Sequence, residues 1–257
     1  MKIVRTVTEM RDARPHAGTV GLVPTMGALH AGHASLFEAA RTECDTVVAS
    51  LFVNQAQFAA GEDFVRYPRD EKGDVRIAEK AGVDILFAPR ADEMYPDGFQ
   101  TWVDVENLSR PLEGEFRPGH FRGVATVCLK LFNIVRPHRA YFGQKDAQQV
   151  AVLRRMVVDL NLDIEIRARP TVRDTDGLAV SSRNAYLSPQ ERERALALPR
   201  ALQTRDPDRA RELLARAKVA TDYVEVLEDN GSRALVGAIR IGSTRLIDNV
   251  PLEGETQ

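Results

Sequence analysis

Apolar and polar positions alternate between two periods in the first two-thirds of the chain. Short apolar runs at residues 21–23, 46–53, 83–87 and 140–142 predict strands. The run 46–53 is nearly continuous in β-branched and apolar residues, which is typical of a strand that is covered on both faces, as in a parallel sheet. These runs therefore predict a buried sheet rather than a half-exposed one.

Between the strands, apolar residues recur at helical spacing. Residues 34–41, 72–81, 124–135 and 147–160 predict helices. Gly82 follows the second of them as a C-terminal stop, and Arg136-Pro137 ends the third. Strands that alternate with helices predict βαβ units, so we expect an α/β fold with an open, doubly wound parallel sheet.

The pattern changes near Pro170. A polar loop at 173–184 is followed by two helical stretches, 189–204 and 208–218, and then by short strand-like runs at 223–227, 235–241 and 244–247. This order predicts a small α+β domain. We therefore expect two domains, residues 1–171 and residues 172–257.

Composition narrows the class of protein. The 257 residues carry 35 Lys+Arg and 37 Asp+Glu, and 44% are hydrophobic, which is ordinary for a globular chain. The near-neutral balance argues against a partner that is nucleic acid or an anionic membrane. The first residues form no secretory signal, and Cys44 and Cys128 stand far apart in apolar contexts. We expect reduced, buried cysteines and a cytoplasmic protein.

The most informative segment for function follows the first predicted strand. Residues 24–33 place Gly27, His30, Gly32 and His33 between a strand and a helix, where backbone N–H groups and the helix dipole favour anions. The two imidazoles can donate hydrogen bonds to a triphosphate. The alternatives are a histidine that only caps the helix, and a zinc site, for which a third ligand is missing. The position favours nucleotide binding.

Two further clusters contain groups that suit phosphate. Lys145 and Asp146 follow a predicted strand, at an end where ligands of open α/β sheets collect. Ser181, Ser182 and Arg183 place two hydroxyls beside a guanidinium. Taken alone, the first cluster is equally compatible with a solvated turn, and the second with an ordinary polar loop.

Together with other segments, these clusters resemble one family. Residues 25–33, 112–114, 117–121, 142–146, 176–179 and 245–249 are similar, in order, to the motifs of the pantothenate synthetase (pantoate–β-alanine ligase) family, which belongs to a larger group of His-x-Gly-His nucleotidyltransferase-like enzymes. The resemblance extends from about residue 20 to about residue 250. No single segment is specific to this family, but the combination of these segments in this order is.

The resemblance implies a fold and an activity. The fold would be a Rossmann-like doubly wound parallel sheet with a smaller C-terminal α+β lid domain, usually in a homodimer. The enzyme would be an ATP-dependent ligase that condenses (R)-pantoate with β-alanine to pantothenate, through a pantoyl adenylate, and releases AMP and pyrophosphate. ATP would be a substrate, and Mg²⁺ would be held mainly by its phosphates rather than by a protein-built metal site.

The resemblance also implies site residues. His33 would be the proton donor, and the other catalytic groups would be His30, Lys145, Ser181, Ser182 and Arg183. Gln57 and Gln149 would bind pantoate, and Gln57 would also lie near β-alanine. The ATP-binding residues would be Met26, Gly27, Ala28, Leu29, His30, Ala31, Gly32, His33, Gly143, Gln144, Lys145, Asp146, Val172, Val180, Ser181, Ser182 and Arg183.

The chain departs from the family pattern in places. It has Asn54-Gln55-Ala56-Gln57 where the family usually reads Asn-Pro-Thr-Gln, which predicts a less constrained loop before Gln57. Val180 stands where the family usually has Met.

Two alternative functions stay open: a nucleotidyltransferase that retains AMP on its product, and a nucleotide-binding sensor without turnover. A tRNA-charging enzyme is disfavoured because no basic anticodon-binding domain is present.

Overall fold

The structure is a computed structural model that describes residues 1–59, 61–229 and 231–252. The chain divides into two compact units. The first unit contains residues 1–143 and 149–169, and the second contains residues 144–148 and the chain from Pro170 onward. The segment Gln144–Gln148 therefore groups with the second unit, although it lies between two elements of the first.

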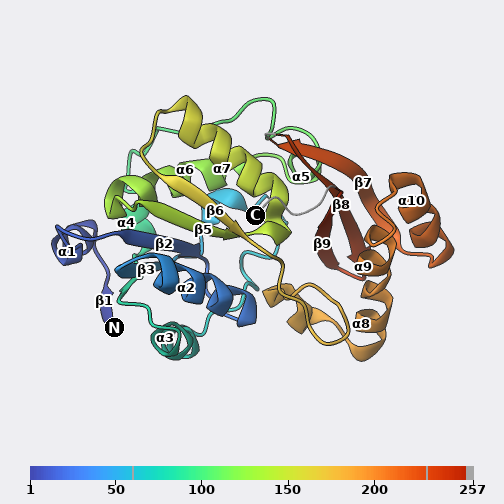
Figure 1. The fold of residues 1–257 in the computed structure, drawn as a ribbon, viewed down its shortest axis with the longest axis horizontal. Helices are drawn as coiled ribbons and strands as arrows, with labels where there is room; N and C mark the ends of the chain where they lie inside the picture. Colours follow the sequence, from blue (N-terminus) through green and yellow to red (C-terminus); the bar gives the residue numbers. More distant parts are fainter. Residues whose placement is uncertain (60, 230, 253–257) are drawn as a thin grey trace. The chain divides into compact units, whose positions relative to one another are not determined.

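The first unit is built on a parallel sheet of six strands (Figure 1). The strands are β1 (Lys2–Val4), β2 (Val20–Thr25), β3 (Thr46–Leu51), β4 (Ile85–Phe87), β5 (Arg139–Gly143) and β6 (Glu165–Arg169). Their order is β1-β4-β3-β2-β5-β6, so the direction of winding reverses between β2 and β5. The predicted α/β class with a doubly wound, Rossmann-like parallel sheet is confirmed. In such sheets, ligands bind where the winding reverses, at the carboxyl ends of the strands.

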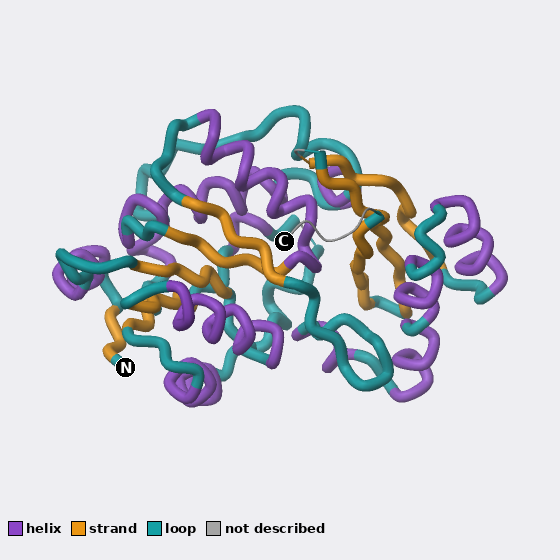
Figure 2. Tube along the Cα trace, in the orientation of Figure 1, coloured by secondary structure: helices purple, strands orange, loops and turns teal. Residues whose placement is uncertain are grey.

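Helices cover both faces of this sheet (Figure 2). Helices α1 (Val7–Ala13), α6 (His120–Val135) and α7 (Ala147–Asp159) pack on one face, and α2 (Ala31–Glu43) and α3 (Glu71–Lys80) on the other. Successive side chains of a strand point to opposite faces. Accordingly, Leu22 is buried with Leu131 of α6, whereas the next residue, Val23, is buried with Phe37 of α2. This double burial explains the continuous apolar runs in the sequence.

The short elements of the first unit lacked a clear sequence signal. Besides β1 and α1, these are α4 (Ala91–Met94), α5 (Glu113–Phe116) and the 3₁₀ turn η1 (Gln55–Gln57). Strand β6 was also unpredicted. It is an edge strand in which Ile166 and Ala168 pack against the core while charged residues alternate with them, so it has no continuous apolar run.

The second unit contains a three-stranded antiparallel sheet of β7 (Ala220–Asp229), β8 (Ser232–Ile241) and β9 (Thr244–Pro251), in that order. Helices α8 (Pro189–Ala195), α9 (Ala197–Leu202) and α10 (Pro207–Arg216) supply its apolar core with the sheet. The 3₁₀ turns η2 (Gln144–Asp146) and η3 (Ser182–Tyr186) complete it. The predicted α+β character of this region is confirmed.

The single helix that we predicted over 189–204 is wrong, because two helices meet at Leu196. Pro199 has no backbone N–H to donate to the carbonyl of Ala195, the last residue of α8, so the helical hydrogen bonding is interrupted between the two helices. The prediction for the cysteines is confirmed, since Cys44 and Cys128 are buried free thiols. Within the described part of the chain, no helix is both long enough and apolar enough to cross a bilayer.

The core of the second unit generates a stability prediction. Leu202 of α9 is fully buried, whereas Leu213 of α10 is 37% exposed. We expect Leu202→Ala to lower the free energy of unfolding by about 2–5 kcal/mol, because it removes apolar burial and leaves a cavity. Leu213→Ala is the matched control and should cost less than about 1 kcal/mol. Urea unfolding followed by circular dichroism measures both, and equal losses would contradict the assignment of this core.

Candidate functional site

The loop from β2 to α2 makes a sharp, fixed turn. The Thr25 hydroxyl donates to the carbonyl of Ser50 (2.6 Å) and accepts from the Gly27 N–H (3.3 Å). Gly27 and Ala28 then both have positive φ, at 86° and 52°. A Cβ on Gly27 would lie 2.8 Å from Oδ2 of Asp74, so only glycine fits this turn without strain.

Asp74 of α3 holds the backbone of this turn. Its carboxylate is only 3% exposed and accepts hydrogen bonds from the N–H groups of Ala28 (3.1 Å) and Leu29 (2.7 Å). Burial raises the pKa of Asp74, and the two backbone N–H groups oppose that shift. A carboxylate that accepts two backbone hydrogen bonds compensates part of the cost of the left-handed conformation at Ala28.

The two histidines of the loop cap helix α2. Nδ1 of His30 accepts from the Gly32 N–H at 3.2 Å, and Nδ1 of His33 accepts from the His30 N–H at 3.3 Å. Their ring centroids are 4.1 Å apart. Because each Nδ1 is an acceptor, a neutral ring carries its proton on Nε2. Capping therefore does not compete with function, since it leaves each ring with one N–H donor, on Nε2.

The turn η1 carries Gln57 and is held at several points. The Asn54 amide donates to Oε1 of Gln57 (2.9 Å) and to the carbonyl of Gly123 on α6 (3.1 Å). A Cβ on Gly123 would lie 2.3 Å from the Ala56 carbonyl oxygen, so glycine permits this close approach. The Gln57 amide in turn donates to Sδ of Met26 at 3.1 Å. These contacts hold the loop although Gln55, rather than a proline, follows Asn54.

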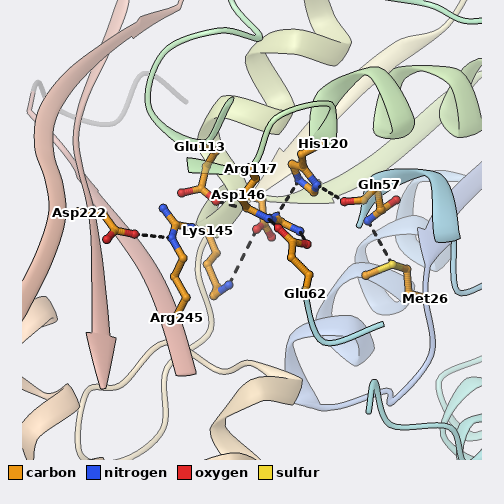
Figure 3. Close-up of polar contacts among 10 residues, drawn as sticks. All are labelled: Met26, Gln57, Glu62, Glu113, Arg117, His120, Lys145, Asp146, Asp222 and Arg245. Carbon is orange, nitrogen blue, oxygen red and sulfur yellow. Dashed lines mark hydrogen bonds and ion pairs between the residues drawn. The ribbon is translucent and has the colours of Figure 1, made fainter. Parts of the chain in front are cut away.

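His120 and Arg117 extend this network (Figure 3). Nδ1 of His120 lies 2.8 Å from the Gln57 carbonyl oxygen, which can only accept, so Nδ1 carries the proton. Nε2 then accepts from Nη1 of Arg117 at 3.0 Å. Burial, together with the charge of Arg117, lowers the pKa of His120 to about 4. The ring is therefore neutral at physiological pH.

A bidentate ion pair with Glu62 fixes the side chain of Arg117. Its Nε and Nη2 donate to the two carboxylate oxygens of Glu62 at 2.8 and 2.9 Å, and Glu113 lies 3.9 Å from Nη1 (Figure 3). Burial alone would raise the pKa of Glu62, but the hydrogen bonds and charge of Arg117 lower it below its usual value. The first unit thus positions Gln57 through a chain of buried, paired groups.

In the second unit, η2 carries Lys145 and Asp146. Nζ of Lys145 lies 3.9 Å from Oδ1 of Asp146 (Figure 3). The amide of Asn249 on β9 donates to the backbone carbonyls of Gln144 (2.8 Å) and Lys145 (2.9 Å). The backbone of this turn is therefore bonded to the small sheet.

The other predicted segment of the second unit begins with a hairpin. The Val180 N–H donates to the Val172 carbonyl at 2.9 Å, which pairs two of the predicted ATP-binding residues. Oγ of Ser181 accepts from the N–H of Arg183 at 3.3 Å and so caps η3, the turn that contains Ser182 and Arg183. The residues of this segment that carry the hydroxyl and guanidinium groups, Ser181 to Arg183, therefore stand at the start of one tight turn.

Each unit therefore contains part of the predicted site. The first unit brings Gln57 against Met26 at the start of the histidine loop, and places Gln149 on α7. The second unit contains Gln144 to Asp146, Val172 and Val180 to Arg183. Among residues 1–59, 61–229 and 231–252, no group of three or more His, Cys, Asp or Glu side chains could hold a metal ion.

Comparison with known proteins decides the family. The family described as Pantoate-beta-alanine ligase matches residues 2–251. A pantothenate synthetase from Geobacter sulfurreducens is 52% identical, with 100% of both chains covered. The chain belongs to the pantoate–β-alanine ligase family.

Solved structures of the family agree in fold. A pantothenate synthetase from Thermus thermophilus has a TM-score of 0.95 at 46% identity, covering 99% of this chain and 100% of that one. A pantoate–β-alanine ligase from Francisella tularensis, complexed with "Beta-gamma ATP and Beta-alanine", has a TM-score of 0.89 at 34% identity and covers 99% of each chain. The family resemblance stated from the sequence is thus confirmed.

Some residues that build the site in this family member had no assigned role in the sequence analysis. Asp74 had one available signal, since a carboxylate lies one helical turn before the buried Ala78, on the inner face of α3. His120 and Asn249 lie in motifs that carry the family resemblance, but a motif does not reveal that a side chain holds a neighbouring backbone. Those roles depend on contacts between residues far apart in the sequence.

The neutral, buried state of His120 generates a pH prediction. Its pKa is near 6.5 in the unfolded chain and about 4 in the folded one, so its contribution to stability is fully present above pH 6.5 and is lost as the pH falls through 4. We expect the stability of the native protein to fall by roughly 3 kcal/mol from this group over that window.

His120→Gln retains a neutral donor and acceptor and should lack this component. The measurement is urea unfolding of both proteins at intervals from pH 7 to pH 4, which reports the difference between their free energies of unfolding. Parallel pH dependences of the two proteins would contradict the assignment.

Proposed function

We propose that the protein joins (R)-pantoate to β-alanine at the expense of ATP, through a pantoyl adenylate, and releases AMP, pyrophosphate and pantothenate. The observation that carries the proposal is the β2–α2 loop, in which Asp74 fixes the backbone and two Nδ1-bonded histidines begin a helix. Such an arrangement suits a polyphosphate. Family membership, and the relative complexed with "Beta-gamma ATP and Beta-alanine", support the two substrates.

Both units would supply groups to ATP. In the first, residues Met26 to His33 lead into the first turn of α2, where the helix dipole favours negative charge, and the two histidine rings offer Nε2–H donors. In the second, the ammonium group of Lys145 and the guanidinium of Arg183 carry the positive charge, and Ser181 and Ser182 carry hydroxyl donors. The remaining ATP-binding residues that we propose are Gly143, Gln144, Asp146, Val172 and Val180.

In the first step, a carboxylate oxygen of pantoate attacks the α-phosphorus of ATP, and the bond from that phosphorus to the bridging oxygen of pyrophosphate breaks. The protein positions the reactants and stabilises charge. His33 donates its Nε2–H to phosphate oxygen that gains negative charge, and His30 and Lys145 are the other donors that we propose for the phosphates. Mg²⁺, held mainly by ATP's own phosphate oxygens, would neutralise part of the polyphosphate charge.

In the second step, the amine of β-alanine attacks the acyl carbon of the adenylate. The bond from that carbon to the AMP oxygen breaks, and the nitrogen loses a proton as the amide forms. Gln57 and Gln149 suit the hydroxy acid because an amide donates and accepts at once. The contacts of Gln57 with Asn54 and Met26 support a fixed orientation for its amide.

Assembly and location complete the proposal. We propose a cytoplasmic homodimer, as the family resemblance implies. Two buried free thiols are consistent with a reducing compartment. Size-exclusion chromatography with light scattering tests the dimer, and a monomer at micromolar concentration would contradict it.

The experiment that tests the proposed function measures AMP and pyrophosphate with each substrate omitted in turn. We expect full turnover only with pantoate, β-alanine and ATP together. Pantoate alone should support exchange of labelled pyrophosphate into ATP, because adenylation precedes attack by the amine. Exchange that requires β-alanine would exclude the two-step route, and AMP retained on the product would favour the nucleotidyltransferase alternative.

His33 can be tested separately. His33→Ala should lower kcat by about 10²–10³, the usual cost of one preorganised donor to developing charge. His16→Ala, which changes an exposed histidine of the first unit, is the matched control and should leave kcat unchanged. The rate of pantoate-dependent pyrophosphate exchange measures the effect. A wild-type rate in His33→Ala would show that His33 acts only as a helix cap.

A further inference from the structure

The segment 245–249 contributed to the family resemblance, yet nothing in the proposed reaction uses it. It lies on β9, an edge strand of the small sheet. Two adjacent residues of this strand, Asp248 and Asn249, are only 3% and 4% exposed, although both are polar. Buried polar side chains are costly unless their hydrogen bonds are satisfied, so their partners indicate what they do.

The partners of Asn249 are backbone atoms of η2. Its Nδ2 donates to the carbonyl oxygens of Gln144 and Lys145 at 2.8 and 2.9 Å. An amide nitrogen has two protons, and both are used here. An amide suits two neighbouring carbonyls because it supplies both donors without bringing a charge into a buried place. The contact therefore fixes the backbone of the residue that carries the Lys145 ammonium group.

The side-chain partner of Asp248 is Arg173, which lies on the hairpin between Val172 and Val180. Its carboxylate accepts from Nη1 and Nη2 of Arg173 at 2.6 and 3.0 Å. Arg173 also donates to the Gly177 carbonyl at the tip of the hairpin (3.2 Å) and to the Asn249 carbonyl (3.3 Å). A bidentate guanidinium–carboxylate pair requires one specific geometry of the two groups. It bonds the hairpin that runs from Val172 into Val180 to the same strand.

We propose that Asp248 and Asn249 are positioning residues that hold the two ATP-facing segments of the second unit on one strand. Consecutive side chains of a strand point in different directions, so two adjacent residues can hold two separate segments. Asn249 acts on Lys145, and Asp248 acts through Arg173 on the hairpin that leads to Ser181 and Arg183. This inference rests on the proposed function, because it assigns ATP to those segments.

The test is a double-mutant cycle on affinity for MgATP, measured by calorimetry without pantoate. Asn249→Ala should weaken MgATP binding about 10-fold, since the η2 backbone loses two hydrogen bonds. If Asn249 acts through Lys145, adding Asn249→Ala to Lys145→Ala should cause little further loss. Wild-type affinity in Asn249→Ala, or losses that multiply fully in the double variant, would overturn the proposal.

Asp248 is tested in the same way against its own segment. Asp248→Asn keeps the volume of the side chain but removes the charge that Arg173 pairs with. In combination with Arg183→Ala, Asp248→Asn should cause little further loss of MgATP affinity. In combination with Lys145→Ala, the fold-losses of the two single variants should multiply. If Asp248→Asn instead causes little further loss of MgATP affinity in the Lys145→Ala background, the unit is loosened as a whole rather than at two separate contacts. That result would overturn the proposal.

Arg240→Gln is the matched control. It breaks the ion pair of Arg240 with Asp222 (2.9 Å), which joins β8 to β7 and includes no residue of either segment, and it should leave MgATP affinity unchanged. Melting temperatures check folding. If Asn249→Ala does not fold, Asn249→Asp fills the same space while facing two carbonyls with an acceptor, and the same loss is expected. A wild-type protein without turnover refutes the proposed function, whereas an active wild type with an unaffected Asn249 variant refutes only this inference.

Discussion

The hydrogen bonds from the Ala28 and Leu29 N–H groups to the buried Asp74 carboxylate are the contact on which the site of the first unit depends. They satisfy two backbone N–H groups of a left-handed turn, and this turn sets where helix α2 begins. With the backbone fixed, the first N–H groups of α2 and the two histidines have defined directions. A site that is ordered before its ligand arrives avoids the entropic cost of ordering it on binding.

The same principle recurs at each segment that carries a proposed site residue. The orientation of Gln57 depends on Asn54 and on the neutral ring of His120. In the second unit, backbone carbonyls of η2 are bonded to Asn249, and the hairpin is bonded to Asp248 through Arg173. In each case a polar side chain holds another part of the protein rather than substrate. Such residues carry the geometry on which charge stabilisation at a phosphate depends.

The sequence predicts the parts that follow from periodicity and from local chemistry. The continuous apolar run 46–53 indicates a doubly covered strand, and Gly27 with His30 and His33 marks the strand-to-helix loop. The sequence pattern does not predict β6, in which charged residues alternate with apolar ones along a sheet edge. It also does not predict the break between α8 and α9 near Pro199. The roles of Asp74 and Asn249 were not predicted, because each depends on a hydrogen bond to a residue that is 46 or 104 positions away in the sequence. Such contacts depend on the tertiary fold, which local patterns do not encode.

The protonation state of the two loop histidines tests this account most directly. Nδ1 of each ring accepts a backbone N–H, so the account requires neutral rings protonated at Nε2. Long-range ¹⁵N–¹H correlation spectra of protein labelled at histidine nitrogen, assigned with His30→Gln and His33→Gln, report this state at neutral pH. The account predicts the Nε2–H tautomer for both residues in the protein without ligand. Signals of the Nδ1–H tautomer, or of rings that exchange freely between tautomers, would show that the loop is not ordered before ATP binds.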